Sequence, residues 1–340
     1  MIRPLLTAIA ALLLLAACAP VTQMAGKPDL TFQGPRLEEH DFVSFDGTHL
    51  GLSAWTPDSG EPWAVIIGLH GMNDYANAFD LAGPYWAQDG IETLAFDQRG
   101  FGRSPERGLW GGRALMAEDL RTITALARQR YPHAIIAVAG ESMGAAVAID
   151  AFASDRPPAA DRLVLISPAV WGWSSQPWPN SAALWLTAHI DGPLVMSPPR
   201  FLENHIRATD NIEELRRMGR DPQMIWGART DTLYGLVDLM QIAWKDAGAT
   251  KIPALYLAGA HDQIIPLHSH FEAARRLRPD DRSALYPDGW HLLLVDHQAG
   301  VVWRDIEGYI RDPAAPLASH TPPIPGAPTP VNTPTVQATR

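Results

Sequence analysis

The sequence predicts an α/β protein in which a mostly parallel β-sheet lies between helices and one helical insertion interrupts the alternation. Short apolar runs, typical of strands buried on both faces, recur between residues 64 and 286. Segments with helical periodicity separate several of them. Residues 169–250 break this rhythm. We therefore expect a sheet domain made of residues 39–168 and 251–312, joined by right-handed crossovers, with 169–250 inserted into it.

The strands are expected in the following order. A hairpin at Phe42–Trp55 opens the domain, because apolar and polar residues alternate around Asp46-Gly47, a dipeptide that tolerates a tight turn. A helix is expected at Leu115–Arg130, where the apolar residues fall on one face. The buried strands expected after the hairpin are Ala64–Leu69, Glu92–Phe96, Ala134–Ala139, Arg162–Ile166, Ala254–Ala258 and Ser283–Tyr286.

Residues 169–250 are predicted to form a helical lid. They contain no convincing buried strand and several helical patterns, such as Ser181–His189 and Thr230–Lys245. Core packing explains any single tryptophan about equally well, but their concentration in an insertion favours a partly open apolar groove. Half of the chain's 12 tryptophans lie here: Trp171, Trp173, Trp178, Trp185, Trp226 and Trp244.

The N-terminus resembles that of a bacterial lipoprotein. The apolar run Leu5–Ala17 is shorter than the roughly 20 residues of a membrane span, but its length suits a signal peptide. The sequence Leu15-Ala16-Ala17-Cys18 resembles a lipobox. The resemblance implies that residues 1–17 are removed, that Cys18 is acylated and that 18–38 tether the domain to a membrane of the bacterial envelope, the outer one if the source is Gram-negative. The alternative is an ordinary secretory signal that happens to end near Cys18.

The C-terminal segment 313–340 is expected to be a disordered tail. It contains eight prolines in 28 residues, separated mainly by small and polar residues. Proline lacks the backbone N–H that helices and sheets use, so we expect no packing against the domain.

Composition excludes several classes of function. The formal net charge of −10 argues against nucleic-acid binding, which needs clustered positive charge. The single cysteine allows neither an intramolecular disulfide nor a thiolate metal site. No phosphate-binding glycine loop is present, and the His268-x-His270 pair lacks further ligands, which favours a structural or surface role. We expect no cofactor and no metal, and the sequence sets no oligomeric state.

Ser142 is the predicted nucleophile. It stands in Gly140-Glu141-Ser142-Met143-Gly144, between a predicted buried strand and a helical run. Such a strand-to-helix turn is so tight that bulky residues two before and two after the serine would clash. The motif alone is common by chance, but this placement makes it specific.

A serine hydroxyl needs a base, and the base needs a carboxylate that fixes its tautomer. Asp262 follows the strand Ala254–Ala258, and His291 follows the next strand. Each of the three residues therefore stands just past a different strand, at one sheet edge. Asp262 could instead merely cap its loop.

An oxyanion hole is predicted from two backbone N–H groups, those of Met72 and Met143. Met72 follows His70-Gly71 after the strand Ala64–Leu69, and the glycine allows close approach to a substrate. Met143 follows the nucleophile at a helix N-terminus, where the dipole favours negative charge. His70 either orients this loop or is simply a packed histidine.

These motifs, with Asp97-Gln98-Arg99-Gly100-x-Gly102-x-Ser104, resemble the monoacylglycerol lipase and lysophospholipase branch of the α/β-hydrolases, which also includes serine aminopeptidases. The resemblance covers residues 38–312 and implies an α/β-hydrolase fold and cleavage of acyl esters of lipid-like substrates. Family members carry a Glu-His pair after His-Gly, where this chain has Asp74-Tyr75. The alternatives are a short-chain carboxylesterase or thioesterase, and a non-catalytic lipid-binding envelope lipoprotein.

Overall fold

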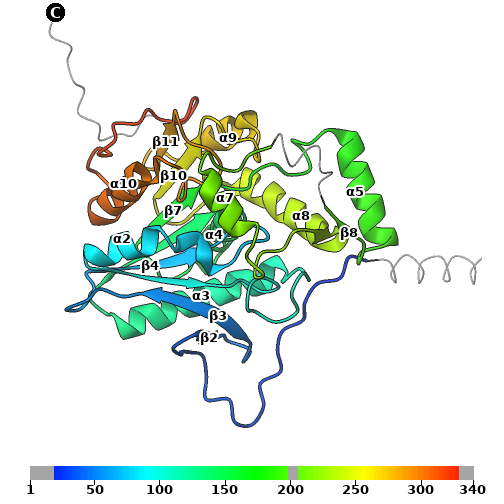
Figure 1. The fold of residues 1–340 in the computed structure, drawn as a ribbon, viewed down its shortest axis with the longest axis horizontal. Helices are drawn as coiled ribbons and strands as arrows, with labels where there is room; N and C mark the ends of the chain where they lie inside the picture. Colours follow the sequence, from blue (N-terminus) through cyan, green and yellow to red (C-terminus); the bar gives the residue numbers. More distant parts are fainter. Residues whose placement is uncertain (1–18, 198–205, 329–340) are drawn as a thin grey trace, which may run out of the picture.

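A mixed β-sheet forms the centre of the molecule (Figure 1). The structure is a computed structural model that describes residues 19–197 and 206–328. In this part of the chain the sheet has nine strands in the order β1-β2-β3-β5-β4-β6-β7-β10-β11. The strands are β1 (Arg36–Leu37), β2 (Asp41–Val43), β3 (His49–Trp55), β4 (Ala64–Leu69), β5 (Ile91–Phe96), β6 (Ile135–Glu141), β7 (Arg162–Ile166), β10 (Ala254–Gly259) and β11 (Arg282–Tyr286).

Six of these strands run parallel. Strands β5, β4, β6, β7, β10 and β11 pair in parallel, whereas β1, β2 and β3 add antiparallel pairs at one edge. The register pairs Leu69 of β4 with Gly140 of β6, and Gly140 with Leu165 of β7. The carboxyl ends of these strands therefore meet at one edge of the sheet, where ligands bind in open α/β folds.

Helices cover both faces of the sheet. Helices α2 (Ala82–Gln88) and α10 (Ala299–Arg311) contribute to the buried cluster on one face, together with the 3₁₀ helix η1 (Ala76–Phe79). Helices α3 (Arg113–Arg130), α4 (Met143–Ala153) and α9 (Leu267–Ala274) pack on the other face. Alternate residues of β4 enter the two clusters, Ile66 the first and Ile67 the second. This arrangement confirms the predicted fold class.

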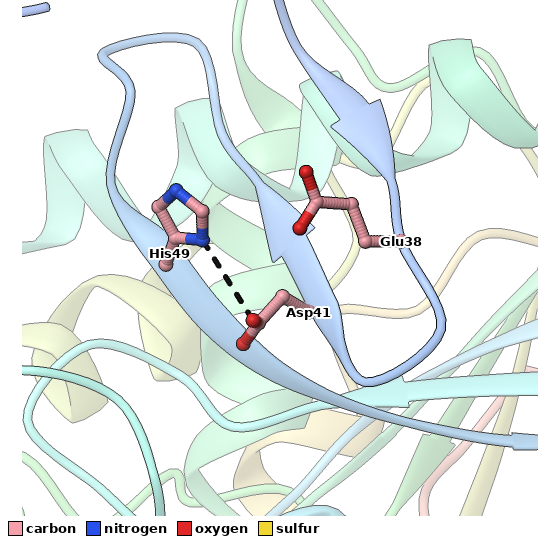
Figure 2. Close-up of side chains that lie close together, drawn as sticks. All are labelled: Glu38, Asp41 and His49. Carbon is pink, nitrogen blue, oxygen red and sulfur yellow. Dashed lines mark ion pairs between the residues drawn. The ribbon is translucent and has the colours of Figure 1, made fainter.

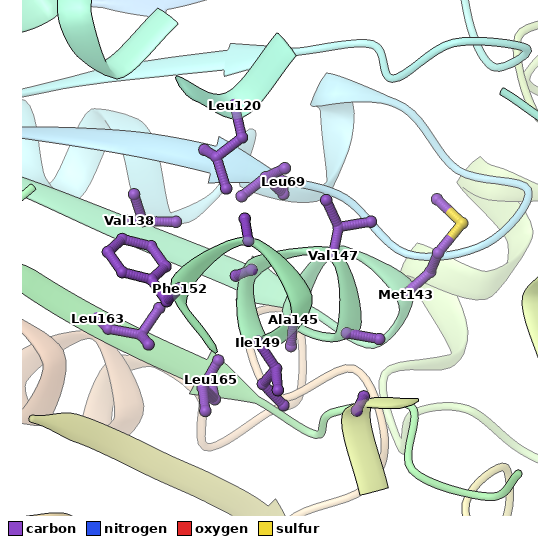
Figure 3. Packing of buried hydrophobic residues seen from close by; sticks show 14 of the residues in the cluster. Leu69, Leu120, Val138, Met143, Ala145, Val147, Ile149, Phe152, Leu163 and Leu165 are labelled. Atoms are coloured by element: carbon purple, nitrogen blue, oxygen red, sulfur yellow. The ribbon is translucent and has the colours of Figure 1, made fainter. Parts of the chain in front are cut away.

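Helix α4 lies at the centre of one core (Figure 3). Its side chains Val147, Ile149 and Phe152 are buried among residues of β4, β6 and β7. The helix is apolar almost all round because α3 and α8 cover its remaining sides. The element that begins at the predicted nucleophile is thereby held rigidly.

The described part of the insertion between β7 and β10 has helices as its main regular elements. It contains α5 (Trp178–Ile190), α7 (Ile212–Met218) and α8 (Thr230–Asp246), and α8 packs on α4 and α5. It also contains a short antiparallel ribbon of β8 (Val195–Met196) and β9 (Ala228–Arg229), two residues each. Strands this short have no sequence periodicity, so the ribbon was not predictable.

The C-terminal segment differs from its predicted disorder over residues 313–328. Ile324 is 1% exposed and belongs to the hydrophobic core. The Leu285 N–H donates to the Pro322 carbonyl at 2.8 Å, so the segment lies against the edge strand β11. Proline cannot donate, but its carbonyl can accept, and this is sufficient to cover an edge. The remaining tail residues lie outside the described residues.

The N-terminal segment also contacts the domain. The Gln23 N–H donates to the Trp110 carbonyl at 2.8 Å, and the Gly26 N–H donates to Asp46 Oδ2 at 2.6 Å. The predicted signal peptide (1–17) and Cys18 lie outside the described residues. No helix in 19–197 or 206–328 is both long enough and apolar enough to cross a membrane.

Candidate active site

Ser142 stands at the tight turn between β6 and α4. Its backbone has φ 52° and ψ −113°, a conformation that non-glycine residues rarely adopt. A Cβ on Gly140 would lie 2.6 Å from the Gly144 carbonyl, and one on Gly144 would lie 2.2 Å from the Leu69 carbonyl oxygen. Both glycines are therefore required, as the motif predicted.

The structure brings Ser142, Asp262 and His291 together. His291 Nε2 lies 3.0 Å from Ser142 Oγ, and His291 Nδ1 lies 2.8 Å from Asp262 Oδ2. All three residues are buried. Asp262 stands on the loop after β10, and His291 on the loop after β11. A proton on His291 Nδ1 leaves the Nε2 lone pair free to accept from the serine hydroxyl.

Asp262 is held as a carboxylate. Burial alone would raise its pKa, but the attraction of His291 and hydrogen bonds from His270 and His291 lower the pKa well below its usual range. The Ile264 and Ile265 N–H groups donate to its Oδ1 at 2.8 and 2.9 Å. The imidazole of His291 therefore faces a fixed negative charge.

The loop after β4 borders the nucleophile. A Cβ on Gly71 would lie 3.3 Å from Ser142 Cβ, so this glycine permits the close approach. Among the described residues, the Met72 amide donates no hydrogen bond, and Met143, as the first residue of α4, has no intrahelical acceptor. These are the two amides predicted to bind an oxyanion.

His70 fixes this loop. Its Nδ1 donates to the Gly71 carbonyl at 2.7 Å, and its Nε2 accepts from the Gln98 N–H at 2.8 Å. Burial lowers the pKa of His70 to about 4, so the ring is neutral. Of the two roles considered for His70, the contacts support orientation of the loop.

The insertion contacts all three loops of the site. The Ile225 N–H donates to Asn73 O at 3.0 Å on the loop after β4. The Arg207 N–H donates to Gln263 beside Asp262, and the Leu292 N–H, beside His291, donates to Ala208 O. Its segments at 206–211 and 221–225 therefore lie next to the catalytic candidates.

Two buried side chains at the site were not predicted. His270 Nε2 lies 3.2 Å from Asp262 Oδ2, although a structural or surface role was expected for this residue. His270 has the spacing of one helix face with Ala273, Ala274 and Leu277, which are also buried. This periodicity is a sequence signal that predicts a buried side chain at His270. Glu141, within the motif itself, is also buried, and burial, with the charges of Asp74 and Asp296, raises its pKa well above the usual range.

A second group of chemically active side chains lies on the N-terminal hairpin (Figure 2). Glu38, Asp41 and His49 place one ligand atom each within 4.8 Å of the others. His49 Nδ1 lies 3.7 Å from Asp41 Oδ2, and Glu38 already accepts from Arg36 at 2.7 Å. Glu38 and His49 are exposed, and such groups are common without an ion. We assign this cluster no function.

Comparison with protein families gives one match across most of the fold. A family model described as serine aminopeptidase, S33 (Hydrolase_4) matches residues 60–298. A monoacylglycerol lipase from Mycolicibacterium smegmatis is 24% identical over 291 residues, which cover 80% of this chain and 96% of that protein. The region that matches the family model includes Ser142, Asp262 and His291.

Solved structures share the fold. A soluble variant of the monoglyceride lipase from Saccharomyces cerevisiae, in complex with a substrate analog, superimposes with a TM-score of 0.68 at 16% identity, covering 88% of this chain and all of that one. The Paleococcus ferrophilus monoacylglycerol lipase gives 0.60 at 22% identity, covering 80% and 99%. A carboxyl esterase from Bacillus coagulans, in complex with glycerol, gives 0.65 at 18%, covering 82% and 99%.

Proposed function

Because the chain belongs to the serine aminopeptidase S33 (Hydrolase_4) family of α/β-hydrolases, we propose that it cleaves acyl esters of lipid-like substrates through an acyl-enzyme on Ser142. One observation carries the proposal: the strained Ser142 lies in a hydrogen-bonded series with His291 and Asp262. A serine held in this way has the base that its hydroxyl needs at neutral pH.

The reaction proceeds in two halves. Ser142 Oγ bonds to the ester carbonyl carbon while its proton passes to His291 Nε2, and Asp262 stabilises the resulting imidazolium. His291 then gives this proton to the leaving alcohol as the carbon–oxygen bond breaks. In the second half, water bonds to the acyl carbonyl carbon while its proton passes to His291 Nε2. His291 then returns this proton to Ser142 Oγ as the bond from Oγ to the acyl carbon breaks, which releases the fatty acid and restores the Ser142 hydroxyl.

The developing negative charge falls on the former carbonyl oxygen. The amide groups of Met72 and Met143 are the donors we assign to it. Met72 follows Gly71, which approaches Ser142, Met143 follows Ser142 directly, and neither amide is used elsewhere in the described hydrogen bonding. Fixed donors aimed at this oxygen lower the activation barrier most in a site that excludes water. The burial of Ser142, Asp262 and His291 favours such a site.

The apolar surface of the insertion supports a lipid-like substrate. Trp178 is 79% exposed and Ile190 is 71% exposed, both on α5. Val195 and Met196 of β8 and Trp226 are also more than 40% exposed. The number of large apolar side chains that this insertion exposes supports contact with an apolar substrate. We assign residues 169–250 as a lid whose inner side receives the acyl chain.

A membrane location fits this substrate class. We propose that Cys18 carries the lipid anchor and that the enzyme acts in a bacterial envelope, at the outer membrane if the source is Gram-negative. The support is the apolar run ended by Leu15-Ala16-Ala17-Cys18. A membrane-tethered enzyme meets amphiphilic esters at its own surface. Cys18→Ser should abolish acylation, and unchanged processing and fractionation would contradict this assignment.

Covalent labelling tests the chemistry. A fluorophosphonate probe should modify the wild-type protein at Ser142 and leave Ser142→Ala unmodified. The control is Ser59→Ala, because Ser59 is exposed, and this variant should label like the wild type. Ser44→Ala would not be suitable, because the Ser44 hydroxyl donates to the buried Asp119. Labelling at another serine, or none, would overturn the proposal.

A panel of substrates tests the specificity. Glycerol and p-nitrophenyl esters from acetyl to decanoyl, below their critical micelle concentrations, should show kcat/KM rising with chain length. Each methylene transferred from water to an apolar wall contributes about 0.8 kcal/mol. A flat or falling series would favour a short-chain esterase, and preference for acyl thioesters or aminoacyl p-nitroanilides would exclude the ester assignment.

A further inference from the structure

The carboxylate that holds His291 also holds a second buried histidine. His270 Nε2 lies 3.2 Å from Asp262 Oδ2, the same oxygen that lies 2.8 Å from His291 Nδ1. The side chains of His270 and Asp262 are both fully buried. Asp262 therefore lies between two imidazoles, one from α9 and one from the loop after β11.

We propose that His270 is a positioning residue of the active site, which orients Asp262 and shares the charge of its Oδ2 atom with His291. This inference rests on the proposed function, because it assigns His270 to the reaction of Ser142. The proposal adds His270 to the set of Ser142, His291 and Asp262, whose mechanism needs only one imidazole beside the carboxylate.

Hydrogen-bond capacity supports the proposal. An ionised carboxylate only accepts, and it offers about four lone-pair directions. Oδ1 takes the N–H groups of Ile264 and Ile265, and Oδ2 takes His291 and His270. These four donors together satisfy the hydrogen-bond acceptors of the Asp262 carboxylate. Without His270, one direction of a buried charge would have no donor, and the carboxylate could turn about its χ2 axis.

Tyr256 orders the proton of His270. The Tyr256 hydroxyl lies 2.9 Å from His270 Nδ1, and both side chains are buried. Burial, with the charge of Asp262, raises the pKa of Tyr256 well above its usual range, so the phenol keeps its proton. It donates to Nδ1, and the proton of a neutral His270 therefore lies on Nε2, facing Asp262. One continuous set of donors thus runs from Tyr256 to Asp262.

The contact of His270 with Asp262 Oδ2 affects His291, the catalytic base, because both histidines contact this oxygen. A donor on Oδ2 draws part of its negative charge, which leaves less to stabilise an imidazolium at His291. Removing His270 should leave more of this charge to His291, which the acid limb of the kcat/KM profile would report. Two other titratable groups lie close enough to matter: Glu141 of β6 interacts with the charge of Asp262, and Asp296 accepts from the Trp290 N–H beside His291. Both are the same in the wild type and the variants, so a difference between profiles reports on His270.

Three variants separate positioning from a structural role: His270→Ala, His270→Gln and, as a control, His268→Ala, an exposed residue on the same helix. We would measure kcat and KM for a p-nitrophenyl ester from pH 5 to 9, with melting temperatures and fluorophosphonate labelling. His270→Ala should lower kcat about 10-fold to 100-fold, as expected for a lost hydrogen bond to a charge, and leave KM within about 2-fold. Its acid-side midpoint for kcat/KM should move to higher pH.

His270→Gln should recover most of kcat, because its amide N–H can donate to Oδ2, whereas His268→Ala should match the wild type. A His270→Ala enzyme that melts lower but keeps the wild-type kcat and pH profile would overturn the proposal. So would a glutamine variant as slow as the alanine variant. If His270→Ala does not fold, Tyr256→Phe takes its place, and an unchanged acid-side midpoint would also refute the role.

The two proposals fail in different ways. If the wild type neither hydrolyses esters nor labels at Ser142, the proposed function is wrong and His270 has no reaction to support. If the wild type labels and hydrolyses but the His270 variants do so equally well, only the positioning role is wrong.

Discussion

The Tyr75 hydroxyl donates to Asp221 Oδ2 at 2.7 Å and thereby joins the loop after β4 to the insertion. Tyr75 stands two residues beyond Asn73, whose carbonyl accepts from Ile225 of the insertion. The resemblance to the lipase family predicts a histidine where Tyr75 stands. In this chain the position therefore holds the insertion against the loop that carries Met72.

Tyr75→Phe should loosen this contact without removing the ring. We expect a loss of about 1 kcal/mol in unfolding free energy, the usual contribution of one hydrogen bond. The kcat/KM for decanoyl esters should fall more than that for acetyl esters, because the insertion forms the proposed acyl wall. Tyr85→Phe is the control, since the Tyr85 hydroxyl makes no hydrogen bond with the described residues. Equal losses for both esters would contradict this role.

Gly144→Ala should abolish activity and strongly destabilise the fold. The new Cβ would lie 2.2 Å from the Leu69 carbonyl oxygen, and neither backbone can move away because β4 and α4 are both buried. Gly308→Ala is the control, because nothing lies within 4 Å of its Cβ position in α10. It should raise the unfolding free energy by about 0.5–1 kcal/mol. Chemical denaturation and labelling of Ser142 measure both variants.

The local sequence pattern was sufficient to predict the buried strands of the sheet and the buried face of α3. The strand Ala64–Leu69 was predicted to the residue, because a strand buried on both faces is an uninterrupted apolar run. Met116, Leu120, Ile123 and Ala127 of α3 are all buried, as their spacing predicted. The motif around Ser142 was equally readable, since its glycines are required by contacts within the turn itself.

Contacts between distant segments were not readable. The hydrogen bond of His270 to Asp262 depends on the packing of α9 near β10, where Tyr256 contacts His270. The sequence indicated only a structural or surface role for this histidine. The proline-rich segment was judged by its missing donors, whereas its carbonyl at Pro322 accepts from edge strand β11 and its single isoleucine enters the core. Both features depend on partners that lie elsewhere in the chain.

Ile324→Ala tests whether this segment is part of the folded domain. The side chain is 1% exposed, so its removal should cost about 2–4 kcal/mol of unfolding free energy through lost burial and the cavity left behind. Ile190→Ala is the matched control, because Ile190 is 71% exposed on α5 and should change the stability by less than about 0.5 kcal/mol. Equal urea midpoints for the two variants would show that residues 313–328 do not contribute to the core.

Asp74 should make the stability of the protein fall as the pH rises towards neutral. Burial, opposed by Arg217 and by a hydrogen bond from the Tyr75 N–H, raises the pKa of this carboxyl to about 7. Its pKa in the unfolded chain is about 3.9. Between these values the folded protein keeps a proton that the unfolded chain has released, so this group's contribution is complete below about pH 4 and is lost as the pH rises through 7.

The slope from this group is about −1.4 kcal/mol in unfolding free energy for each pH unit within that window. Asp74→Asn cannot ionise, so its stability relative to the wild type should increase steadily from pH 5 to pH 7. Urea denaturation at pH 5, 6, 7 and 8 measures the difference, with the exposed Asp58→Asn as the control that should run parallel to the wild type. A constant difference between Asp74→Asn and the wild type would show that Asp74 is ionised throughout this range, with Arg217 offsetting its burial.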